Sequence, residues 1–277
     1  MLKARWGLLI ILTGITSGLW FYLWQVTTTK ALTVSFLNIG QGDSIFIEGP
    51  NGNQMLIDGG PGKIVLSELG QIMSWSDRFI DVMMATHPDA DHVGGLPFVL
   101  DRFQIGTILE PGVSADTQTY QHLENEIKLK KVPKILARRG MKIILDKGVS
   151  FTILWPDRDT SQMETNDASI VGRLEYGETS FYLNGDSPLK IEKYLIQKDG
   201  SNLQSTVLKA GHHGSRTSTG QRFLDMVYPT YAVISAGLHN RYGHPHQEVI
   251  DRLEAKNIKI LSTAEEGRIT FKIFQQS

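Results

Sequence analysis

The chain begins with an uncharged, mostly apolar stretch and continues with short apolar runs separated by polar turns. No charged residue lies between Trp6 and Thr29, and a helix over this stretch is long enough to cross a bilayer core, which needs about 20 residues. Lys3 and Arg5 precede the stretch, which favours a cytoplasmic N-terminus. We therefore expect residues 1–30 to form a membrane anchor or signal segment, followed by one folded domain over residues 31–277.

The alternative for this segment is a signal peptide that is removed. The sequence from Val26 to Ala31 lacks a clean pair of small residues at the cleavage spacing, which favours an uncleaved anchor. The sequence thus predicts a single-pass protein of the cell membrane with its domain outside the cytoplasm, joined by a short linker at residues 27–30. Secretion after cleavage stays open as the alternative.

Apolar periodicity beyond Lys30 predicts a mixed α/β (α+β) domain. Runs of β-branched and aliphatic residues between Gly- and Asn-bearing turns predict strands, and runs with a helical period predict helices. The expected strands are 32–37, 44–48, 54–57, 80–85, 142–145, 150–155, 170–176, 180–184, 205–209, 231–235, 258–262 and 268–273, and the expected helices are 64–75, 96–103, 118–131, 189–197, 222–228 and 245–256. We expect two sheets packed face to face with helices outside.

Composition narrows the chemistry. The 28 basic and 29 acidic residues nearly cancel, which argues against a surface that binds nucleic acid everywhere but not against a local basic groove. The chain has no cysteine, so disulfides, thiolate metal sites and cysteine nucleophiles are excluded. Any metal must therefore be held by histidine nitrogens and carboxylate oxygens.

The strongest motif is His87-Pro-Asp-Ala-Asp-His92, which directly follows an expected apolar strand. It places two imidazoles and two carboxylates within six residues, and such groups at the end of a strand suit a cation site. A solvated polar turn is the alternative.

Three further polar positions follow expected strands, each next to glycine: Asp58, Asp186 and the pair His212-His213. Taken singly, an Asp-Gly pair is typical of an ordinary turn. Four such motifs, each after a β-rich run, favour one shared metal site.

Together these motifs resemble the metallo-β-lactamase superfamily and, more narrowly, the hydrolase domain of the ComEC competence family. The matching segments are Phe36-Leu-Asn-Ile-Gly-Gln-Gly-Asp-Ser44, Leu56-Ile-Asp-Gly-Gly60, Thr86-His-Pro-Asp-Ala-Asp-His-Val-Gly-Gly95, Asn166-Asp-Ala-Ser169, Asn184-Gly-Asp186, His212-His-Gly-Ser215 and Asn240-Arg-Tyr-Gly-His-Pro245. The resemblance implies an αββα sandwich with two divalent metal ions at one edge of the sheets.

The resemblance also implies roles for individual residues. It implies that His87 and Asp89 hold one metal ion, that Asp91 and His92 hold the second, and that Asp186 bridges the two. His212 would complete the second ion's ligands, with His213 as the open alternative, and Asp58 would orient the His-Asp loop by hydrogen bonds.

The sequence departs from the wider superfamily at two ligand positions. Asp89 stands where a second histidine is usual, and no histidine lies between His122 and His212, a region where the ComEC-like pattern has Asn166 and Ser169. Oxygen donors are harder ligands than imidazole nitrogens, so replacing histidines by aspartate favours Mn²⁺ relative to Zn²⁺.

Two such cations would activate water for attack on phosphorus. We expect Asp91 and Asp186 to act in catalysis, and Ser215, Asn166 and Ser169 to contact substrate. His244 would contact a phosphoryl oxygen or protonate the leaving group, the alternative being a histidine that caps the helix after Pro245.

The family resemblance points to DNA as the substrate, and hence to a surface-anchored phosphodiesterase or deoxyribonuclease linked to DNA uptake. One alternative is hydrolysis of another extracellular phosphodiester, such as a phosphocholine-bearing wall polymer. Another is a non-catalytic accessory of an uptake machine that binds DNA, which the intact ligand set disfavours.

Overall fold

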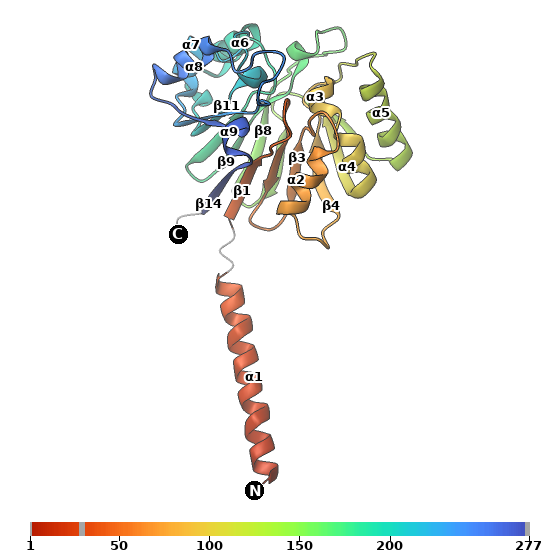
Figure 1. The fold of residues 1–277 in the computed structure, drawn as a ribbon, viewed down its shortest axis with the longest axis vertical. Coiled ribbons are helices and arrows are strands. Elements are labelled where there is room, and N and C mark those ends of the chain that lie inside the picture. The colour runs from red at the N-terminus through yellow and green to blue at the C-terminus, as the bar shows by residue number, and fades with distance from the viewer. Residues whose placement is uncertain (1, 28–30, 275–277) are drawn as a thin grey trace.

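The protein folds as two seven-stranded sheets packed face to face with helices on the outer faces, as seen in a computed structural model that describes residues 2–27 and 31–274 (Figure 1). This is the αββα sandwich that the sequence predicts. The mixed α/β class and the two-sheet arrangement are therefore confirmed.

The first sheet contains the N-terminal half of the domain and the last strand of the chain. Its order is β14 (Ile269–Phe274), β1 (Ala31–Phe36), β2 (Ile45–Glu48), β3 (Gln54–Ile57), β4 (Phe79–Met84), β5 (Gln104–Glu110) and β6 (Lys134–Leu136). β14 pairs antiparallel with β1, whereas β3 to β6 run parallel. Helices α2 (Ile64–Ile72), α4 (Leu96–Arg102) and α5 (Gln118–Lys130) contribute to the apolar cluster on its outer face.

The second sheet has the order β13 (Lys259–Ser262), β12 (Tyr231–Ile234), β11 (Val207–Lys209), β10 (Thr179–Leu183), β9 (Val171–Tyr176), β8 (Val149–Trp155) and β7 (Lys142–Asp146). Its outer cluster includes residues of α6 (Leu189–Asp199), α7 (Gln221–Val227) and α8 (Gln247–Glu254). This half of the chain also contains three short 3-10 helices and one short α-helix: η1 (Asn166–Ala168), η2 (Gly200–Leu203), η3 (Gly211–Gly214) and α9 (Thr263–Glu266).

The core between the sheets follows from strand alternation. Leu32, Val34 and Phe36 of β1 are fully buried there and meet Phe151 and Phe181 of the second sheet. Successive side chains of a strand point to opposite faces, so every second residue of β1 enters this core. Burying one phenylalanine stabilises the fold by roughly 1.5–3 kcal/mol.

Several elements, among them β5, β6 and α3, were not expected from the sequence. β5 contains Gly106 and ends in a buried glutamate, and all three residues of β6 are exposed, so neither shows a clear alternation. The His-Asp motif, expected to be a loop, contains the short helix α3 (Ala90–Val93). Helix α5, which the sequence predicts at residues 118–131, buries Tyr120, Leu123 and Ile127 at helical spacing.

Residues Leu2–Thr27 form helix α1, which stands apart from the two sheets (Figure 1). The structure does not support the membrane span expected for residues 1–30, because none of the helices in residues 2–27 and 31–274 is both long and apolar enough to cross a bilayer. Polar and small residues from Thr13 to Gly18 interrupt the aliphatic run. The expected linker at 27–30 lies almost wholly outside the described residues.

Candidate metal centre

The predicted site residues follow strands of both sheets. His87 comes after β4, Asp186 after β10, and His212 and His213 lie in η3 after β11. β10 and β11 are parallel neighbours, with Leu183 opposite Lys209, so the segments that follow them begin at the same edge of the second sheet. Side chains that are distant in sequence therefore converge at one locus.

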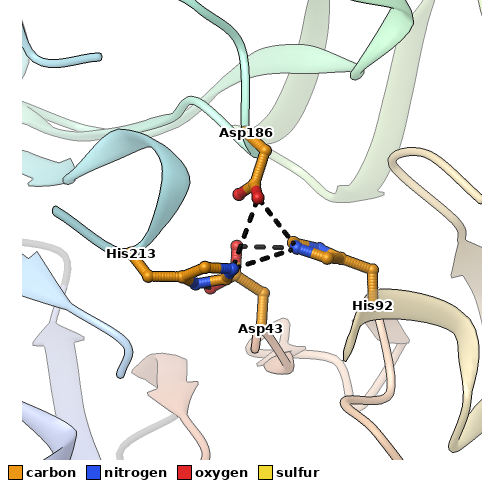
Figure 2. A group of neighbouring side chains, drawn as sticks. All are labelled: Asp43, His92, Asp186 and His213. Atoms are coloured by element: carbon orange, nitrogen blue, oxygen red, sulfur yellow. Dashed lines mark hydrogen bonds and ion pairs between the residues drawn. The ribbon is translucent and has the colours of Figure 1, made fainter. Parts of the chain in front are cut away.

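Four buried side chains lie closest together at this edge: Asp43, His92, Asp186 and His213 (Figure 2). Each offers a ligand atom within 4.8 Å of the other three. The sequence singled out His92 and Asp186 as ligands and His213 as an alternative, whereas it did not single out Asp43.

The separations between atoms suit one tetrahedral cation. The Nε2 atoms of His92 and His213 lie 3.3 Å apart, and each is 3.3 Å from Asp186 Oδ2. Asp91 Oδ2 is also 3.3 Å from His213 Nε2. A tetrahedral ion with bonds of about 2.0–2.1 Å separates its ligand atoms by about 3.3 Å, so His92, His213 and Asp186 fit one divalent ion, with the Asp91 carboxylate beside it.

A second group of side chains also lies near Asp186. His87 Nε2 is 3.6 Å from Asp89 Oδ2 and 4.0 Å from Asp186 Oδ2, and it is buried without a hydrogen-bond partner. His212 Nε2 lies 3.7 Å from Asp186 Oδ2, and its side chain is 27% exposed. One carboxylate oxygen of Asp186 is thus within 4.0 Å of four imidazole nitrogens, a position from which it can bridge two cations.

Asp58 orients His92 directly, and His87 through Thr86, by contacts to the Nδ1 side of each ring. Its Oδ2 lies 2.8 Å from His92 Nδ1, and Thr86 donates to the same carboxylate from its backbone N and its hydroxyl. A carboxylate only accepts here, so Nδ1 of His92 carries the proton and Nε2 is left to bind a metal. Thr86 Oγ1 is also 3.0 Å from His87 Nδ1.

Asp43 and Lys209 are the residues that sequence reasoning missed. Asp43 Oδ1 lies 3.3 Å from Nδ1 of His213, on the side of the ring away from Asp186, so Asp43 is placed to orient the imidazole. Asp43 Oδ2 pairs with the buried Lys209 ammonium, which also donates to Gly185 O at 2.9 Å. The available signals were a Gly-rich loop before Asp43 and a single charge in an apolar strand.

The turn η3 is conformationally strained. His212 (φ 50°) and His213 (φ 55°) both occupy the left-handed region, which is uncommon for residues other than glycine. Gly214 follows with φ 80°, and a Cβ there would come within 2.7 Å of Pro245 Cβ. This backbone brings both imidazoles toward Asp186.

Charge is concentrated in the cluster. Burial alone would raise the pKa of Asp186, but His213, His92 and Lys209 outweigh it and hold that pKa well below its usual value. Burial alone would lower the pKa of His213, but the carboxylates of Asp186 and Asp43 outweigh it and raise that pKa. Binding of a divalent cation must therefore displace protons from imidazoles.

The expected substrate-contacting residues lie around this cluster in different ways. Ser169 is buried, and its hydroxyl accepts a hydrogen bond from the backbone N of Asp186 at 3.0 Å, so it positions the aspartate. Ser215 is buried and bonds to Thr217. Asn166 begins η1 and has a buried Oδ1 without a partner.

His244 lies beside the η3 histidines. Its ring centroid is 5.5 Å from that of His212 and 6.2 Å from that of His213. Burial, together with these two imidazoles, lowers the pKa of His244 to about 4. His244 does not cap α8, because the residue at the N-cap is His246, whose side chain makes no capping bond.

Comparison with known proteins identifies the family. The sequence model of the Metallo-beta-lactamase superfamily matches residues 37–238. ComE operon protein 3 of Bacillus subtilis is 30% identical over 256 residues, which are 86% of this chain and 33% of that protein. Competence protein ComA of Neisseria gonorrhoeae is 29% identical over 274 residues, which are 96% of this chain and 35% of that protein. The chain thus spans about a third of the length of these relatives.

A solved structure shows the same fold. The metallo hydrolase Igni18 of Ignicoccus hospitalis superposes with a TM-score of 0.55 at 17% identity, covering 86% of this chain and 98% of that one. At 17% identity the match shows a shared fold and nothing about function. The family model and the competence relatives confirm the resemblance that the sequence motifs predicted.

Proposed function

We propose, from the premise that this chain belongs to the metallo-β-lactamase superfamily, that it is a metal-dependent phosphodiesterase that cleaves DNA. The superfamily and the Asp/His cluster identify a metal-binding hydrolase. The phosphodiester substrate is our proposal, supported by competence proteins among the relatives.

The observation that carries the proposal is the position of Asp186. Its Oδ2 is 3.3 Å from Nε2 of His92 and of His213, 3.7 Å from that of His212, and 4.0 Å from that of His87. We propose that Asp91, His92, Asp186 and His213 hold one divalent ion, and that His87, Asp89 and Asp186 hold a second, with His212 at its edge. Zn²⁺ or Mn²⁺ suits such donors.

Divalent ions bound there would lower the pKa of water and neutralise charge on a phosphoryl oxygen. The chain's own residues then orient the reaction. The Asp91 carboxylate, 30% exposed, can accept a hydrogen bond from the attacking water. With its pKa lowered to about 4, His244 is neutral at pH 7, so it suits donating a hydrogen bond to a phosphoryl oxygen better than protonating a leaving group.

For location, we propose that residues 31–277 act outside the cytoplasm. The support is the uncharged N-terminal stretch after Lys3 and Arg5. A C-terminal fusion to an enzyme active only outside the cytoplasm tests this orientation. Activity of the fusion is the expected result, and an inactive fusion present at normal level contradicts it.

The catalytic proposal is tested with the full chain after removal of metal by a chelator. Mn²⁺ or Zn²⁺ is then restored, and cleavage of single-stranded DNA, double-stranded DNA and bis(p-nitrophenyl) phosphate is followed. We expect metal-dependent cleavage of DNA by the wild type and loss of at least about 1,000-fold in rate for Asp186→Asn, because both ions lose their shared ligand. Asp251→Asn, on the exposed face of α8, is the matched control.

Other outcomes separate the alternatives. Cleavage of the small diester but not of DNA would favour another phosphodiester, such as a wall polymer. DNA binding without turnover of either substrate would favour an accessory subunit. An unchanged rate for Asp186→Asn would remove the bridging role.

A further inference from the structure

A hollow of about 410 Å³ opens beside Asp91. Its volume is in the range of small-molecule sites, roughly 300–1,000 Å³. Three loops and α3 line it, through Gln41, Pro61, Ala90, Asp91, Asn240, Arg241 and Tyr242. Because Asp91 Oδ2 is 3.3 Å from His213 Nε2, a group in this hollow adjoins the metal centre.

Tyr242 presents an exposed aromatic ring at this hollow. Its side chain is 47% exposed, and its ring stacks on that of His244 with centroids 5.7 Å apart and planes at 21°. The Arg241 guanidinium lies 4.8 Å from the centroid of the same ring. An aromatic ring and a guanidinium plane are the groups on which nucleobases stack.

The loop holds Tyr242 in place. The side chain of Asn240 donates to the carbonyls of Gly237 and His244 and accepts from the backbone N of Tyr242 and of His244. Asn240 therefore uses its amide for the loop itself. A ring fixed in this way loses little conformational freedom when a ligand stacks on it.

Gln41, on the opposite loop, offers an unused donor. Its Oε1 accepts from the backbone N of Gly237 at 3.2 Å, which fixes the orientation of the amide. Its Nε2 is buried and has no partner. Since buried polar groups are almost always paired, an acceptor on a ligand would complete this group.

We infer that this hollow binds the nucleobase of a nucleotide adjoining the scissile phosphate. The inference rests on the proposed nuclease function and deepens it. The base stacks at Tyr242 and Arg241, and Gln41 donates to an acceptor of the base. Stacking accepts every base, so the site recognises a nucleotide without reading a sequence.

A choline group is the competing occupant, because quaternary ammonium ions bind to aromatic rings. Here the Tyr242 ring already lies under the Arg241 guanidinium, whose charge repels a second cation. An uncharged planar base meets no such repulsion. The hollow therefore suits nucleic acid better than a phosphocholine-bearing polymer.

The test compares an intact single-stranded oligonucleotide with a series in which one nucleotide at a time is abasic. The full chain is used, with cleavage followed in Mn²⁺ and binding followed by fluorescence anisotropy in chelator. We expect an abasic residue at one position next to the scissile bond to lower kcat/KM by about 5- to 100-fold, and the same position to weaken binding. For the Tyr242→Ala variant, the same abasic nucleotide should change kcat/KM by less than about 2-fold relative to intact DNA, because this variant has already lost the stacking interaction.

Tyr242→Phe keeps the ring and should retain the abasic effect. Tyr228→Ala removes a tyrosine that is 79% exposed at the end of α7, and it should behave as wild type. If the wild type cleaves and binds every abasic oligonucleotide as well as intact DNA, the base site is overturned while the nuclease proposal stands. If the wild type cleaves no DNA with either metal, both are overturned. The abasic series on the wild type decides the matter even if Tyr242→Ala does not fold.

Discussion

The Nε2 atoms of His92 and His213 lie 3.3 Å apart although 121 residues separate the two histidines in the sequence. Nδ1 of His92 is paired with Asp58, and Nδ1 of His213 lies 3.0 Å from the carbonyl of Ser235. In the neutral rings, both Nε2 atoms therefore present lone pairs to each other. A divalent cation bound between them would accept both lone pairs, in place of the protons that nearby carboxylates favour by raising the pKa of each ring.

Replacing the η3 histidines one at a time distinguishes their roles. His213→Ala should lower the affinity for the ion held by Asp91, His92, Asp186 and His213 by more than about 100-fold. Loss of an orienting partner lowers metal affinity by about 10–100-fold, and loss of a ligand should lower it more. His212→Ala should have a smaller effect, because His212 is farther from Asp186 and more exposed. Calorimetric titration of the metal-free protein measures both. Equal losses, or a larger loss for His212→Ala, would contradict the assignment.

Asp58 accepts a hydrogen bond from Nδ1 of His92, so replacing it should weaken metal binding without removing a metal ligand. Asp58→Asn keeps the shape but replaces one acceptor oxygen with a donor that opposes His92 Nδ1 or Thr86. We expect a loss of about 10–100-fold in metal affinity and a rate that recovers at high metal concentration. Metal titration of the rate measures this, and a rate that stays low at saturating metal would show a different role for Asp58.

Lys209 stabilises the fold through charge. Burial by itself lowers the pKa of Lys209, but Asp43 and Asp186 outweigh it and raise that pKa, so the ammonium stays charged. Lys209→Met leaves Asp43 buried without its cation, and we expect a loss of about 3–5 kcal/mol in the free energy of unfolding. Urea unfolding without metal measures this.

Lys256→Met is the matched control, because Lys256 pairs with Asp225 at the surface, where a pair contributes less than about 1 kcal/mol. The double variant Lys209→Met with Asp43→Asn should recover part of the lost stability. Equal stability of Lys209→Met and Lys256→Met would contradict the role given to the buried pair.

Glu192 should make stability depend on pH. Burial outweighs hydrogen bonds from Gly220, Thr219 and Asn184 and raises the pKa of Glu192 from 4.5 to about 7. The folded state therefore holds a proton that the unfolded state has lost between these pH values. This contribution is complete below about pH 4.5 and is lost as pH rises through about 7, by at most about 1.4 kcal/mol per pH unit.

Glu192→Gln cannot ionise and should lack this slope. Urea unfolding of both proteins at pH 5, 6, 7 and 8 gives the comparison. The stability of the wild type relative to Glu192→Gln should fall by up to about 3 kcal/mol across the series. A constant difference between the two proteins would rule out the raised pKa.

Local patterns predicted most of the fold. The alternation in β1 placed Leu32, Val34 and Phe36 on one face, and these residues are buried between the sheets. β6 was missed because it is a three-residue strand at the edge of a sheet, exposed at every position. Because none of its residues is buried, β6 shows no alternation of buried and exposed positions.

The site was predictable only in part for a similar reason. Each expected ligand follows an apolar strand and adjoins glycine or lies in the His-Asp motif, which is local information. The position of His213 nearest Asp186 depends on two successive left-handed residues, which no pattern reveals. The contact between Asp43 and Lys209 joins the two sheets and depends on the tertiary fold.

The most direct test of the metal centre is an anomalous-scattering map from crystals of the protein grown with Mn²⁺ or Zn²⁺. The account predicts a peak about 2.0–2.2 Å from Nε2 of His92, Nε2 of His213 and Oδ2 of Asp186, and its absence in Asp186→Asn. A fully occupied ion elsewhere, with no peak between His92 and His213, would contradict it.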